Sequence, residues 1–194
     1  MKGWITQYAA SEEFEAKSNH ILAEIPLLPD EWKISLKLKP KNIWLGGHDS
    51  NVILLTNGIR GFSPPRIFVS QRGVLTINGG VNKPHSVSYF AQAADKLRKG
   101  EEWVEIQISQ EFTSSLPKKL MYRVVIDGEE ELIVENKTPQ FFENVKLYTG
   151  YETSTVSPFN GRIKDLSIKI KEDNMIKYRH HYLKDPPAGE FNVL

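Results

Sequence analysis

The segment Trp32-Lys-Ile-Ser-Leu-Lys-Leu-Lys39 decides the fold class of this protein. Large apolar residues occupy its even positions, and Lys or Ser occupies every odd position. A period of two is typical of a β-strand with one buried face, because successive side chains of a strand point to opposite sides. The sequence therefore predicts a strand here, with Trp32 and Leu38 facing a core.

Similar alternation recurs along the chain between turn signals. Further strands are predicted at residues 20–25, 51–56, 66–70, 73–78, 85–90, 103–112, 120–126, 132–134, 145–147, 161–170 and 176–182. Asn57-Gly58 and Asp127-Gly128 supply the positive φ angles that tight turns require. Ile163 is one position out of phase with Leu166, which predicts a β-bulge near Lys164.

Almost no helix is predicted. Residues 91–99 are the stretch with good helix formers, and they predict at most one short helical turn. Many short strands with so little helix predict an all-β protein, an antiparallel β-sandwich of two packed sheets. Neither a linker nor an internal repeat divides the sequence, so residues 1–194 are predicted to form a single domain.

Composition excludes several classes of function. The chain has 194 residues, with 25 Lys and Arg against 24 Asp and Glu, so no overall positive field favours nucleic acid. Apolar runs are too short for a membrane helix, and membrane insertion is not predicted. Because the sequence has no cysteine, a disulfide scaffold, thiolate metal sites and cysteine catalysis are excluded. The start, Met1 to Trp4, has no apolar signal core, which is typical of a cytosolic protein or a mature segment.

The order of the segments over residues 20–171 resembles a laminin-G-type, concanavalin A-like lectin and glucanase jelly roll of secreted animal proteins. The resemblance rests on Glu31–Pro40, Asn51–Gly58, Arg66–Ser70, Gly73–Asn78, Glu102–Ile108, Tyr122–Gly128 and Asn160–Ile168. It implies a jelly-roll module in the extracellular space, as a mature segment without its signal peptide. Its implied partner is a glycan or an extracellular protein, and a homo-oligomer is compatible with it.

Three departures from that family bear on function. The residues after Asn57-Gly58 include no carboxylate where calcium-binding laminin-G domains place an aspartate. Neither the His-x-Asn-x-Arg strand of galectins nor the Glu-x-Asp-x-(x)-Glu strand of laminarinases occurs. His48-Asp49-Ser50-Asn51 offers too few oxygen ligands for a calcium cage, so no cofactor is predicted.

Catalytic arrangements are weak in this sequence. Glu129 and Glu131 have the spacing of two carboxyl groups on one strand face, as a glycosidase requires. They directly follow the Asp127-Gly128 turn, however, where a solvated hairpin end is the better interpretation. A nucleophile elbow is absent, and the five histidines do not form a metal-site spacing. The chain is therefore predicted not to be an enzyme, with a glycoside hydrolase kept as the third hypothesis.

Loop aromatics with polar neighbours give the leading hypothesis, a lectin-like module. Sugar rings stack on exposed Trp or Tyr, and polar side chains satisfy the hydroxyls. Two loops at one end of the sandwich supply these types and are predicted to bind the ligand: Trp44, His48, Asp49 and Asn51, and Tyr148, Tyr151, Asn160 and Arg162. In the alternative, Trp44 plugs a loop, Tyr148 is a corner tyrosine, and the protein is a structural or adhesive module without a sugar site.

A basic stripe on the first strand offers another surface. Lys33, Lys37, Lys39 and Lys41 share the face opposite to Trp32. Such a stripe is able to bind sulfated or acidic glycans by charge-assisted contacts. Lysines on outer strands also prevent sheets from pairing edge to edge, and the second interpretation is the stronger one.

Overall fold

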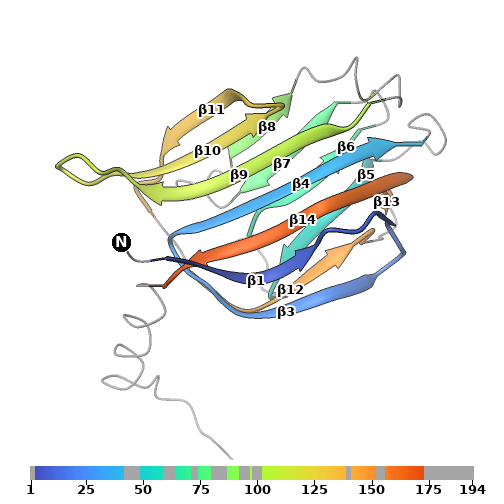
Figure 1. The fold of residues 1–194 in the computed structure, drawn as a ribbon, viewed down its shortest axis with the longest axis horizontal. Helices are drawn as coiled ribbons and strands as arrows, with labels where there is room; N and C mark the ends of the chain where they lie inside the picture. The colour runs from blue at the N-terminus through green and yellow to red at the C-terminus, as the bar shows by residue number, and fades with distance from the viewer. Residues whose placement is uncertain are drawn as a thin grey trace, which may run out of the picture.

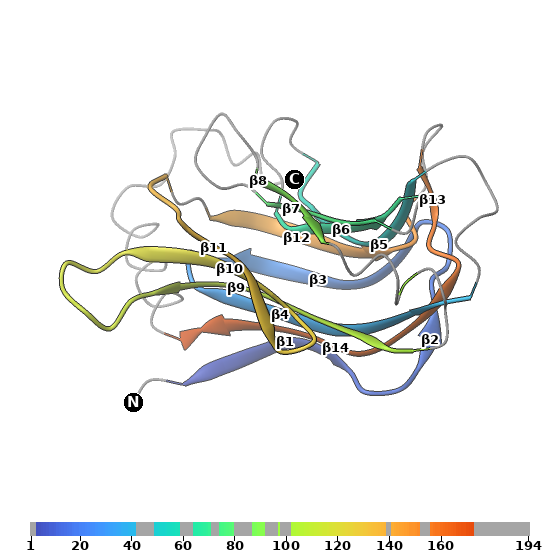
Figure 2. The ribbon, with the colours of Figure 1, turned by 90° about the horizontal axis from the view of Figure 1, so that it is seen from above.

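The computed structural model describes residues 3–41, 49–58, 64–70, 74–79, 87–91, 97, 102–138, 141–151 and 156–172, with side chains omitted at 49 and 87–91. Within these ranges the chain forms strands β1 to β14, arranged in two sheets. Figure 1 shows one sheet in front of the other, and Figure 2, turned by a quarter, shows the two layers one above the other. The predicted antiparallel β-sandwich is confirmed.

The first sheet, called sheet A, has the order β1-β14-β4-β9-β10-β11, and β2 pairs with β14. All of its pairs are antiparallel. Its strands are β1 (Trp4–Ala10), β2 (Phe14–Glu15), β4 (Trp32–Pro40), β9 (Val104–Phe112), β10 (Leu120–Ile126), β11 (Glu129–Glu135) and β14 (Gly161–Lys171).

The second sheet, called sheet B, has the order β3-β12-β5-β6-β7-β8. Its main strands pair antiparallel, whereas β13 pairs with β5 in parallel. Its strands are β3 (His20–Leu28), β5 (Asp49–Thr56), β6 (Arg66–Val69), β7 (Leu75–Gly79), β8 (Val87–Ala91), β12 (Phe142–Thr149) and β13 (Val156–Pro158).

The core lies between the two sheets and is built from alternate residues of the strands. In β4 every even residue from Trp32 to Leu38 is buried, and every odd residue is half-buried on the outward face. On sheet B, the same alternation turns Ile67 and Ile77 inward to the core. Each large apolar side chain that is buried in this way stabilises the folded state by roughly 1.5–3 kcal/mol.

The predicted Asp127-Gly128 turn and the predicted bulge are confirmed. Asp127 and Gly128 have φ angles of 51° and 84° between β10 and β11. The register of β14 against β4 shifts between Lys164 and Ser167, and Asp165 has a φ of 52°. One extra residue therefore reconciles the phase of Ile163 with that of Leu166, and both side chains are buried.

The edge strands differ from the sequence prediction. No strand was expected at β1 or β2, because the exposed edge strand β1 buries few residues and shows little alternation. The strand β11 begins at Glu129, three residues before the predicted start. The expected strand 176–182 lies outside the described residues. Of the predicted helical turn at 91–99, the structure describes Ala91, which ends β8, and Leu97, which is buried. None of the helical segments in the described part of the chain is long and apolar enough to span a bilayer.

Candidate functional site

A row of four residues crosses the outward face of sheet B. Tyr148 on β12 is the register partner of Leu54 on β5, Leu54 is the partner of Arg66 on β6, and Arg66 is the partner of Asn78 on β7. Side chains of directly opposed residues share one face of a sheet, and their neighbours Leu55, Ile67 and Ile77 face the core. Figure 2 shows β12, β5, β6 and β7 together in the upper layer. We call Tyr148, Leu54, Arg66 and Asn78 the outer row.

Arg66 is the charged member of the outer row. Its guanidinium carbon lies 5.5 Å from the centre of the Phe68 ring, a cation–π distance. Its Nε is buried and has no hydrogen-bond partner. Burial lowers the pKa of Arg66 from its ordinary value, although a guanidinium stays protonated at neutral pH. The strand pairing thus holds a partly desolvated cation on the sheet face.

Asn78, opposite Arg66, also has an unpartnered polar atom. Its Oδ1 is buried and accepts no hydrogen bond. Most buried polar groups in proteins are hydrogen-bonded, so two such atoms on paired residues are unusual. This part of the outer row therefore contains one buried donor and one buried acceptor that are both left unsatisfied.

Two tyrosines form the other end of the outer row. The rings of Tyr148 and Tyr151 pack edge to face, with centroids 5.3 Å apart and an angle of 72° between the planes. The backbone N–H of Tyr151 donates to Oδ1 of Asn51 at 3.3 Å, and the N–H of Phe159 donates to the carbonyl oxygen of Asn51 at 3.0 Å. Asn51 is fully buried, and its Nδ2 has no partner. Asn51 therefore anchors both chain segments beside the tyrosines.

The structure brings three of the predicted ligand-binding residues together: Asn51, Tyr148 and Tyr151. Trp44 and His48 lie outside the described residues, and Asp49 is described by its backbone alone, as the first residue of β5 and the partner of Val156. Trp44, His48 and Asp49 are therefore assigned no side-chain position.

The other two predicted residues belong to sheet A. Asn160 is exposed, and its carbonyl oxygen accepts a hydrogen bond from the N–H of Lys41 at 3.0 Å. Arg162 lies on the outward face of sheet A, because the next residue, Ile163, is buried in the core. Its Nη1 contacts Oε1 of Glu13 at 2.7 Å. Arg162 therefore lies on the opposite side of the sandwich from Tyr148, not in one cluster with it.

Sequence reasoning missed Arg66, Phe68 and Asn78. The available signal was the alternation in Arg66–Val69, which places Arg66 and Phe68 on the face away from the core. Alternation alone does not mark them as a site, because it places any outward-facing residue of a strand in the same way.

The lysine stripe on sheet A is paired with carboxylates. Lys33 contacts Glu111 at 3.0 Å, and Lys37 contacts Asp165 at 3.2 Å. Lys33 also lies over the ring of Trp4 at 4.4 Å. The positive charge of this face is therefore largely compensated by neighbouring side chains.

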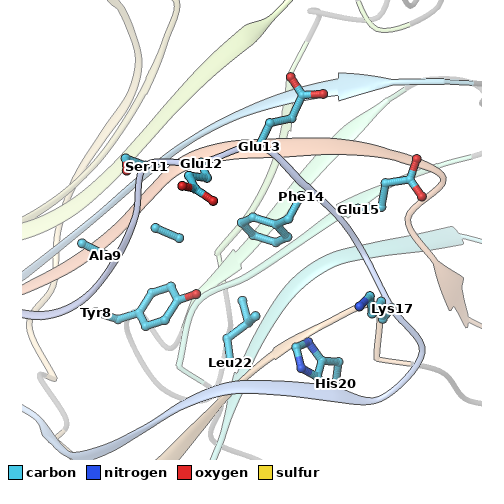
Figure 3. Close-up of a pocket in the computed structure, with 11 residues that line it drawn as sticks. Tyr8, Ala9, Ser11, Glu12, Glu13, Phe14, Glu15, Lys17, His20 and Leu22 are labelled. Carbon is cyan, nitrogen blue, oxygen red and sulfur yellow. The ribbon is translucent and has the colours of Figure 1, made fainter.

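A surface pocket of about 440 Å³ lies at the corner where the chain crosses from sheet A to sheet B. Figure 3 shows the Tyr8 hydroxyl directed toward the space between Phe14 and Leu22. These three residues pack against the core and form the apolar floor. Of the carboxylates at the rim, Glu13 pairs with Arg162 and Glu15 with Lys41. The pocket has an apolar floor but no cluster of reactive groups among its lining residues.

The carboxylates considered for catalysis are exposed. Glu129, Glu130 and Glu131 all lie on the edge strand β11 in contact with solvent. Glu130 forms an ion pair with Arg123 at 2.9 Å. In the ranges that the structure describes, no group of three or more histidines and carboxylates is placed to hold a metal ion.

Comparison with solved structures identifies the same architecture. A point mutant of HCR/D superposes with a TM-score of 0.56 at 13% identity, over 95% of this chain and 46% of that one. The receptor-binding domain of botulinum neurotoxin D gives 0.53 at 13% identity, over 94% and 45%. The CBM40 domain of the Ruminococcus gnavus IT-sialidase, bound to α2,6-sialyllactose, gives 0.52 at 14% identity, over 87% and 98%.

This chain spans less than half of the two longer proteins and nearly all of the CBM40 domain. No protein-family model matches the sequence, and no curated protein sequence matches it. At these identities the likeness establishes the fold: the chain is a β-sandwich of the kind used by a sialyllactose-bound CBM40 domain.

Proposed function

We propose that this protein is a non-catalytic glycan-binding module, and that its binding surface is the outer row together with Tyr151. The observation that carries this proposal is the arrangement of the row itself. Aromatic rings stand at one end, at Tyr148 and Tyr151, and unpartnered polar atoms stand at the other, on Arg66 and Asn78.

This arrangement suits the chemistry of sugars. A pyranose ring presents a flat C–H face that packs on an aromatic side chain, and its hydroxyls need donors and acceptors in the same plane. Tyr148 and Asn78 are three strands apart, about 14 Å at a spacing of about 4.8 Å per strand. A short oligosaccharide lying across the strands would contact both ends of the row.

The CBM40 domain with bound sialyllactose supports a glycan as the ligand class, since it shares the fold over nearly its whole length. We also propose the finer assignments that agree with this role: a laminin-G-like type, an extracellular location and a single domain over residues 1–194. Affinity for one sugar is expected to be weak, so firm attachment to a glycan-bearing surface would depend on several copies acting together.

A glycan array probed with the purified protein tests the proposal. Tyr148→Ala is expected to lower binding of every bound glycan by about tenfold, because it removes a stacking platform worth about 1–1.5 kcal/mol. Arg123→Ala is the matched control, since Arg123 is an exposed arginine on sheet A. If the wild type binds no neutral or acidic glycan on the array, the proposal is refuted.

A further inference from the structure

Arg66 is a cation with no paired anion among the residues that the structure describes. The arginines on sheet A are paired, Arg123 with Glu130 at 2.9 Å and Arg162 with Glu13 at 2.7 Å. Arg66 forms no ion pair with any residue in the described ranges, and its one described side-chain interaction is with the ring of Phe68. Burial lowers the pKa of Arg66, as expected for a guanidinium that pairs with none of the described carboxylates.

This arrangement is costly unless something compensates for it. Partial burial removes water from the guanidinium, and the Phe68 face replaces only part of the lost solvation. An attraction between opposite charges at such a site is several times stronger than it would be in open water. An anion at Arg66 would therefore gain more than an anion at the solvated lysines of sheet A.

The buried Nε leaves the two Nη groups as the donors that an incoming anion would have to meet. Two parallel N–H donors match the two oxygens of a carboxylate or a sulfate. The row also places this fork two strand spacings, about 10 Å, from the ring of Tyr148.

We propose that the outer row selects anionic glycans, and that Arg66 holds the carboxylate or sulfate of a sugar whose neighbouring ring packs on Tyr148. This inference rests on the proposed glycan-binding function and adds the substrate class to it. Leu54 lies between the two anchors and provides an apolar floor, being 8% exposed.

Isothermal titration with lactose, 3′-sialyllactose and 3′-sulfolactose tests the selection. Both acidic sugars are expected to bind at least about tenfold more tightly than lactose, as one bidentate charge-assisted contact allows. Arg66→Gln is expected to abolish this preference, so that both acidic sugars bind the variant no more tightly than lactose does. A preference for only one of the two acidic sugars identifies carboxylate or sulfate as the recognised group.

Two further variants separate charge from geometry and from folding. Arg66→Lys keeps the charge but loses the fork, so an intermediate preference is expected. Arg123→Gln removes an arginine from sheet A and is expected to keep the full preference. Thermal unfolding of each variant shows whether it is folded.

The outcomes distinguish the two proposals. Equal affinity of the wild type for lactose and the acidic sugars would overturn the anion selection and leave glycan binding intact. An acidic preference that survives Arg66→Gln would also overturn it, because the anion would then bind elsewhere. If none of the three sugars binds and the array shows no bound glycan, the glycan-binding function itself is overturned.

Discussion

Arg66 and Asn78 stand directly opposite each other on β6 and β7, yet the Nε of one and the Oδ1 of the other are both buried without a hydrogen-bond partner. Folding has removed water from a donor and an acceptor on one face of the sheet without joining them. Each such atom costs about 1–3 kcal/mol when it is left unsatisfied. The protein retains this cost at the surface where we place its ligand.

Replacing Arg66 should therefore stabilise the protein while it weakens binding. Arg66→Met keeps most of the side-chain volume and removes the desolvated charge, so we expect the free energy of unfolding to rise by about 1 kcal/mol. Urea denaturation measures this change. A loss of stability instead would mean that Arg66 serves the fold and not the ligand.

Tyr122 offers a test of burial inside the core. Its hydroxyl is buried with no partner, and burial raises the pKa of Tyr122 from the ordinary value of 10.0. The folded state therefore favours the neutral phenol, and this stabilisation is present below pH 10 and is lost as the pH rises further. Tyr122→Phe is expected to raise stability at pH 7 by about 1 kcal/mol.

The same variant should flatten the fall in stability of the wild type above about pH 10. Unfolding in urea at several alkaline pH values measures this slope. An unchanged slope in Tyr122→Phe would show that another group controls alkaline unfolding.

Gly79 is required for space rather than for backbone freedom. A Cβ at Gly79 would lie 2.8 Å from the Tyr122 hydroxyl and 3.0 Å from Cε2 of the same ring. We expect Gly79→Ala to lower the free energy of unfolding by about 1–3 kcal/mol, because the buried ring must shift. Adding Tyr122→Phe should recover part of this loss, since it removes the nearest atom.

Gly58 provides the control for that double mutant cycle. It has a φ of +81°, and a Cβ added there would meet nothing within 4 Å, so Gly58→Ala is costly through backbone strain alone. Tyr122→Phe should therefore leave the effect of Gly58→Ala unchanged. If Tyr122→Phe changes the effect of Gly58→Ala on stability as much as that of Gly79→Ala, the steric explanation is contradicted.

Asn51 is predicted to support the tyrosine end of the outer row. Asn51→Ala removes the acceptor of the Tyr151 N–H, and we expect a loss of about 1–3 kcal/mol in stability and weaker glycan binding. Asn160→Ala is the matched control, since the Asn160 side chain is exposed and its structural contact is made by its backbone. Circular dichroism on heating and the glycan array measure the two effects.

The lysine stripe should contribute little to either property. Lys33→Ala and Lys37→Ala remove half-exposed side chains from surface ion pairs, and each is expected to change stability by less than about 1 kcal/mol. Binding of acidic glycans should also stay within about twofold of the wild type, because neighbouring carboxylates already compensate these charges. A large loss of binding would move the anion site to sheet A.

The alternation in β4 was enough to predict its buried and exposed faces, from Trp32 to Leu38. The phase slip between Ile163 and Leu166 likewise predicted the bulge that the structure contains. Both follow from local geometry, because side chains of a strand alternate and one inserted residue reverses their sides. By contrast, the sequence pattern does not predict β1, because an edge strand that is exposed along most of its length needs little alternation.

The candidate site depended on tertiary structure. The four residues of the outer row lie on strands that are neighbours in sheet B. Two of these strands, β5 and β12, are separated by six other strands in the chain. Periodicity specifies which side of each strand is buried, but it says nothing of which strands pair. For the same reason the sequence could place Arg162 near Tyr148 in a loop, whereas the fold sends them to opposite outward faces. The amino-acid pattern thus determined the two-layer sandwich, and strand order, which depends on long-range pairing, decided which polar and aromatic side chains share a surface.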